Sequence, residues 1–165
     1  MLSKYVQLVP LHRGGHLLHL HCGDYTFGRA AEGGHLAMMR FLRDRRCPWT
    51  KVTCADAAGG GQLEALQWLI SEGYRWDQRV GEFAAMGGHV HVLEWAIDRG
   101  MLWPWRNLTA FAARGGQLAT LQWLLERGWS WNYSILVDAA ANGVGLFKLL
   151  SVVTHSGLKP PGFNP

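Results

Sequence analysis

A short motif repeated at nearly constant spacing constrains the fold of this chain more than any other feature. Each copy has two alanines, one variable residue, two glycines, a histidine or glutamine, and an aliphatic residue. Four clear copies and a weaker fifth begin at Ala30, Ala57, Ala84, Ala112 and Ala139. Successive copies start 27, 27, 28 and 27 residues apart. Such even spacing predicts a row of similar units, each too small to bury its apolar surface alone.

Each unit is predicted to contain two helices joined by the glycines of the motif. After the motif, apolar residues recur at steps of three and four, which places them on one helical face. A glycine then follows at Gly73, Gly100 and Gly128, where a helix C-terminus favours a left-handed residue. The pattern therefore predicts a short helix, a turn, a longer helix, a glycine stop and a loop.

Tryptophans occupy two recurring positions in these units. One lies in the second helix and one in the following loop: Trp68, Trp95 and Trp123 in the helix, with Phe41 in the first unit, and Trp49, Trp76, Trp103 and Trp131 in the loop. This regularity predicts packing in the core or in the seams between units rather than a ligand cage. Full burial of one such side chain stabilises a fold by about 3 kcal/mol.

The composition is that of a globular protein, with 48% apolar and 17% charged residues. No uncharged apolar run approaches the roughly 18 residues of a membrane span, and the first ten residues lack a secretory pattern. We therefore expect neither export nor a membrane anchor. Three cysteines without C-x-x-C spacing, Cys22, Cys47 and Cys54, predict the absence of a disulfide framework and a reducing, cytoplasmic location.

The net charge of +4 is modest, and much of the excess lies early in the chain. The residues concerned are Arg40, Arg43, Arg45, Arg46 and Lys51. A basic end could favour an acidic partner or nucleic acid, although a solvated surface is the more common meaning of such a cluster.

The repeated motif resembles the ankyrin repeat, which runs from T-P-L-H-x-A-A through G-H-L to a closing glycine. The resemblance covers about residues 25 to 157. It implies an all-α, ankyrin-like solenoid of stacked helix-turn-helix repeats. The ankyrin period is 33 residues, so about six are missing from each unit here. The missing residues belong to the segment between the closing glycine and the next helix. In ankyrin repeats this segment is a β-hairpin called the finger, so the resemblance implies shortened fingers.

The chain is most similar to the short, tryptophan-rich repeats of giant DNA viruses and some protists, where Cys47-Pro48-Trp49 matches a frequent loop. A viral source would place it in a host cell and imply a host–virus interaction. The Thr-Pro start of the family pattern is absent. We divide the chain into a degenerate N-terminal capping repeat (1–24), five repeats of about 27 residues (25–157) and an irregular tail (158–165).

Neither catalysis nor metal binding is expected. His12, His16 and His19 are spaced for one helical face, but Gly14 and Gly15 interrupt that helix, so we predict no metal and no cofactor. In the family, a histidine at the position of His35 and His89 hydrogen-bonds the turn backbone. Glutamines replace it in two other units, which suits a structural role. No catalytic motif is present, and Cys54 is interpreted as a small hydrophobe.

Function is expected at positions that vary while the framework repeats, and by resemblance those beside the alanine pairs face the concave side. The predicted partner-binding residues are Phe83, Met86, Trp105, Phe111, Arg114, Arg29 and Asp56. Aromatic, Met and Arg side chains are typical of interface hot spots. Phe83 and Phe111 could equally pack between adjacent first helices. We predict a monomer that binds a protein partner; a basic solenoid that binds nucleic acid is the alternative.

Overall fold

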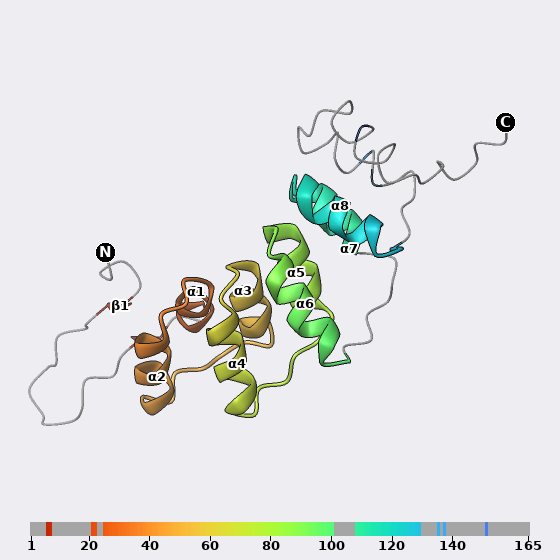
Figure 1. Cartoon of the computed structure of the whole chain (residues 1–165). Helices are drawn as coiled ribbons and strands as arrows, with labels where there is room; N and C mark the ends of the chain where they lie inside the picture. The colour runs from red at the N-terminus through yellow and green to blue at the C-terminus, as the bar shows by residue number, and fades with distance from the viewer. Residues whose placement is uncertain are drawn as a thin grey trace, which may run out of the picture.

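A computed structural model describes residues 25–100 and 108–129, with the pairs 6–7 and 21–22 and the single residues 135, 137 and 151. The described residues form four helix pairs (Figure 1). The pairs are α1 (Thr26–Glu32) with α2 (Leu36–Asp44), α3 (Thr53–Gly59) with α4 (Leu63–Ser71), α5 (Arg79–Gly87) with α6 (Val90–Asp98), and α7 (Leu108–Arg114) with α8 (Leu118–Glu126).

Two short strands are the exception to this helical structure. β1 (Val6–Gln7) and β2 (His21–Cys22) pair antiparallel, with Val6 opposite Cys22. They lie in the segment for which a degenerate capping repeat is predicted. The prediction of an all-α chain is confirmed for the other described elements. No helix among the described residues is both long enough and apolar enough to cross a bilayer.

The first helices of the pairs form a closely packed row. α1 contacts α3, α3 contacts α5, and α5 contacts α7, while each first helix also contacts its own second helix. The alanine pairs lie in this row and are at most 5% exposed. Because alanine has a small side chain, it lets neighbouring backbones approach closely. No comparably close pair of neighbouring second helices occurs in the described part of the chain.

The first glycine of each turn packs directly on the backbone of the preceding unit. A Cβ atom at Gly60 would overlap the carbonyl oxygen of Glu32, and one at Gly115 would overlap that of Met86. A Cβ at Gly87 would lie 2.5 Å from the carbonyl oxygen of Gly59. The same contact thus joins all three described interfaces. It explains why the motif needs glycine here, where no larger residue would fit.

Leucines fill the space between first and second helices. Leu66, Leu93 and Leu121 occupy equivalent positions and are at most 1% exposed. At the far end of the second helices, the predicted stop glycines have left-handed backbones; for Gly73, φ is +88°. The predicted helix–turn–helix–stop pattern is therefore confirmed for the described units.

The tryptophans of the second helices lie in the seams but are only partly buried. Trp68, Trp95 and Trp123 pack against the core cluster, each with part of its surface exposed. Trp123 Nε1 donates a hydrogen bond to Glu94 of the preceding unit, at 3.3 Å. The Arg43 guanidinium lies 5.5 Å from the Trp68 ring, again across a seam. These side chains bridge second helices whose backbones are farther apart.

Two sequence predictions about single side chains need correction. Among the loop tryptophans, Trp49 is 51% exposed, although its ring contacts Phe27 and Tyr74. Cys47 is disulfide-bonded, contrary to the expectation from the odd number of cysteines. The spacing of the cysteines along the chain did not indicate this disulfide. Cys54 is free and 3% exposed.

Replacing Gly60 with alanine should destabilise the fold by about 3 kcal/mol, because the new methyl group would push apart two backbones. Gly60 has φ of −84°, so the loss would come from this overlap and not from backbone strain. Gly73→Ala is the matched control. Its Cβ would meet nothing within 4 Å, so only the left-handed backbone is penalised, by about 1 kcal/mol. Urea unfolding measures both; equal losses would contradict the backbone contact.

Candidate functional site

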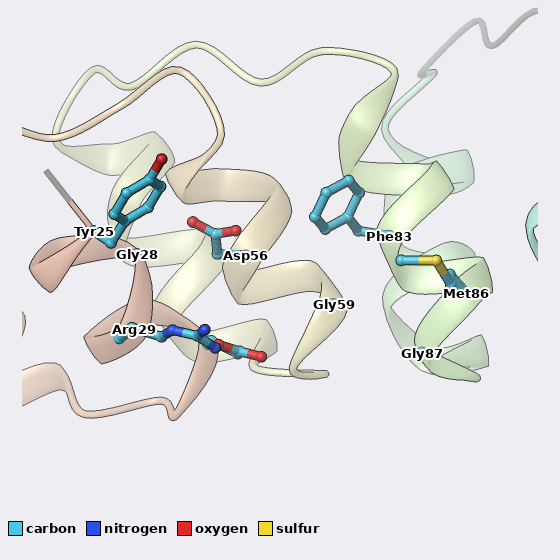
Figure 2. A pocket seen from close by; sticks show the side chains of 9 residues that line it. Tyr25, Gly28, Arg29, Asp56, Gly59, Phe83, Met86 and Gly87 are labelled. Atoms are coloured by element: carbon cyan, nitrogen blue, oxygen red, sulfur yellow. The ribbon is translucent and has the colours of Figure 1, made fainter. Parts of the chain in front are cut away.

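A groove of about 350 Å³ lies on the row of first helices. Side chains from α1, α3 and α5 surround it (Figure 2). Its lining residues are Tyr25, Gly28, Arg29, Glu32, Asp56, Gly59, Phe83, Met86 and Gly87. Four of the seven predicted partner-binding residues, Arg29, Asp56, Phe83 and Met86, are therefore brought to one site.

The groove is bordered at one point by a glycine, Gly59, in place of a larger side chain. Gly59 occupies the position held by Glu32, Met86 and Arg114 in the other units. Phe83 lies beside this gap: a Cβ at Gly59 would come within 3.3 Å of the ring. Figure 2 shows Phe83 and Met86 extending from α5 toward the side of α3. Together they form an apolar wall at one end of the groove.

Asp56 provides a partly buried carboxylate on α3. Its Oδ2 atom occupies the space that a side chain at Gly28 would need. Burial, and next the negative charge of Glu32, raise the pKa of Asp56 above its ordinary value, while Arg29 and Arg79 act in the opposite direction. Among the described residues, no side chain donates a hydrogen bond to this carboxylate. Asp56 is therefore a costly group whose hydrogen-bonding capacity is unused inside the fold.

Arg29 and Glu32 form an ion pair along the edge of α1. Arg29 Nη1 lies 2.7 Å from Glu32 Oε2, and both side chains are about half exposed. An exposed pair of this kind contributes little to stability. With Asp56, the pair leaves one excess negative charge at this end of the groove.

The predicted residues of α7 lie beside the groove without lining it. The Arg114 guanidinium stands 5.7 Å from the Phe111 ring. Phe111 packs against the core cluster, whereas Phe83 lines the groove. Phe111 thus contacts the core and Phe83 lines the groove, while both rings remain partly exposed. Trp105 lies outside the described residues.

Several groove residues were not among the predicted ones. Gly59 could have been found, because it stands at the variable position after the alanine pair, where the other clear units carry Glu32, Met86 and Arg114. Tyr25, which is 76% exposed, precedes the first described helix and has no repeat pattern to mark it. Glu32 stands at the variable position after the alanine pair, and the helix brings it beside Arg29, three residues earlier.

The other candidate groups have structural surroundings. His89 Nε2 lies 2.9 Å from the carbonyl oxygen of Gly59 in the preceding unit, which confirms its predicted role at the turn. Burial raises the pKa of the Cys54 thiol to about 12, so the thiolate is scarce at neutral pH. No cluster of three metal-ligating side chains occurs among the described residues. The candidate metal residues His12, His16 and His19 lie outside them.

Comparison with known proteins does not assign this site. No protein-family model matches the chain, and no curated protein matches its sequence.

The Asp56→Asn variant should melt at a higher temperature than the wild type at pH 7. Because the folded-state pKa of Asp56 lies above the ordinary 3.8, its ionised form destabilises the folded chain at higher pH. The difference should vanish below about pH 4, where the wild-type carboxyl is protonated in both states. Glu64→Gln, at an exposed carboxylate on α4, is the control. An unchanged or lower melting temperature at pH 7 would show that Asp56 is satisfied within the fold.

Proposed function

We propose that this chain is a non-catalytic protein-interaction module: a curved solenoid of shortened, ankyrin-like helix pairs that binds a partner protein in the groove of its first helices. The observation that carries the proposal is the groove itself. It gathers variable residues from three successive units, while the residues that recur are used in packing.

The curvature follows from unequal packing on the two sides of the stack. First helices approach closely through alanine and glycine, whereas second helices are separated by tryptophan and arginine side chains. A row that is closer on one side than on the other must bend toward the closer side. The first-helix row would therefore be the concave side, and repeat arrays commonly use this side for binding.

The chemistry of the groove suits a protein partner. Phe83 and Met86 are partly exposed, and aromatic and Met side chains are enriched in interface cores. They border a carboxylate and an ion pair, which could orient a ligand. The groove residues include no serine, cysteine or histidine that could serve as a nucleophile or as the base that activates one.

Nucleic acid is a weaker alternative. Its phosphates would meet the excess negative charge of Asp56 in the groove, since Glu32 is paired with Arg29. Elsewhere, the basic cluster is partly engaged: Arg43 pairs with Asp44 and Glu72, and the Arg45 guanidinium lies 4.6 Å from the Phe41 ring. The ion pairs of Arg43 reduce the charge available to phosphates, whereas Arg45 keeps its charge beside the ring.

Phe83→Ala should remove partner capture and leave the fold intact. A hot-spot aromatic contributes about 2 kcal/mol or more to binding, so proteins that co-purify with the wild type from a lysate should be lost, as measured by quantitative mass spectrometry. Phe41→Ala is the matched control, because Phe41 is 40% exposed but lies on α2. Loss of the same proteins from both variants would exclude a specific role for the groove. Circular dichroism checks folding.

Binding to a labelled DNA or RNA duplex should be weak near physiological salt. A phosphate-binding surface loses affinity steeply as salt rises, with a slope set by the number of phosphates contacted. Fluorescence anisotropy over a range of salt concentrations measures this slope. Tight binding with a steep slope, retained in the Phe83→Ala variant, would favour the nucleic-acid alternative over the protein partner.

A further inference from the structure

We propose that the groove binds an extended peptide segment in which a lysine or arginine reaches Asp56 and an apolar side chain two or three residues away packs on Phe83 and Met86. This inference rests on the proposed function, and it specifies the chemistry of the partner.

The charge of the groove favours a cation. Glu32 is neutralised by Arg29 at 2.7 Å, so the carboxylate of Asp56 is the group left in excess. It is partly buried, and no described side chain donates to it. A guanidinium or ammonium group would supply the missing hydrogen bonds, and charge-assisted bonds of this kind are the strong ones. An acidic or phosphorylated segment would instead add a like charge beside Asp56.

The spacing of the helices sets the spacing of the ligand side chains. Asp56 and Phe83 occupy the same position, just before the alanine pair, on the adjacent helices α3 and α5. Packed helices lie roughly 8–10 Å apart, and an extended chain advances roughly 3.3 Å per residue. Two or three residues of extended peptide therefore span the distance from the carboxylate to the aromatic ring.

The floor of the groove leaves room for a peptide backbone. Gly59 lines it without a side chain, whereas the spaces beside Gly28 and Gly87 are filled by the Asp56 carboxylate and the Gly59 carbonyl oxygen. A segment could lie across α3 over the gap at Gly59, with its basic side chain toward Asp56 and its apolar side chain toward α5. The groove volume of about 350 Å³ accommodates a few side chains, which matches the short segment proposed.

The test is selection of peptides from a phage-displayed library of random twelve-residue sequences on the full-length chain. Enriched peptides should carry a lysine or arginine two or three residues from an aliphatic or aromatic residue. Synthetic copies are then titrated by fluorescence polarisation. The Asp56→Asn variant should bind them about tenfold more weakly or worse, as expected for loss of a charged hydrogen bond. The Glu64→Gln variant should bind them like the wild type.

A double-mutant cycle assigns the contact. Replacing the basic residue of the peptide with glutamine should weaken binding to the wild type by a similar factor and should cost little more in the Asp56→Asn variant. If the two replacements weaken binding independently of each other, the proposed pairing of the basic residue with Asp56 is wrong.

The outcomes separate this inference from the proposed function. Enriched peptides that need Phe83 but contain no basic residue would overturn the inference and leave the interaction module standing. If no peptide is enriched, or if the enriched peptides bind the Phe83→Ala variant as well as the wild type, both fail.

Discussion

The contact between a turn glycine and a carbonyl oxygen of the preceding unit determines the arrangement of the described helices. At Gly60, Gly87 and Gly115, the backbone of one unit lies where a Cβ atom would otherwise be. The alanine pairs keep the same row of helices close along its length. Since both contacts depend on the absence of side chains, each interface is set by the backbone, and the variable residues beside it can change without moving the helices.

This close packing on one side leaves the second helices to be joined by long side chains. Trp68, Trp95 and Trp123 are large enough to cover the seams, and arginines stack on them; the Arg127 guanidinium, for example, lies 4.1 Å from the Trp123 ring. A partly exposed indole covered by a guanidinium excludes water from the edge of the core without requiring close backbones. The abundance of tryptophan is thus a consequence of the unequal spacing.

The groove residues differ from the framework because the fold does not need them. Asp56 is held where burial opposes its charge, and Phe83 lies over a gap that Gly59 leaves open. Phe111 occupies the same repeat position as Phe83 but packs against the core. Phe83 lines the groove because Gly59, in the preceding unit, leaves space beside its ring. Asp56 and Phe83 form the proposed site beside Gly59.

The sequence by itself determined the local structure: the motif predicted the turns, the two helices of each unit and the stop glycines, since these depend on residues close together in the chain. The predicted difference in helix length is absent in the third unit, where α5 and α6 both have nine residues. The sequence also selected Arg29, Asp56, Phe83 and Met86 as variable positions. Only the tertiary structure decided that these four share one groove, that Phe111 packs against the core, and that Cys47 is disulfide-bonded. Each of these depends on distances between units. A residue about 27 positions away in the sequence lies in the neighbouring unit, and its size decides whether the space beside a given side chain is filled or open.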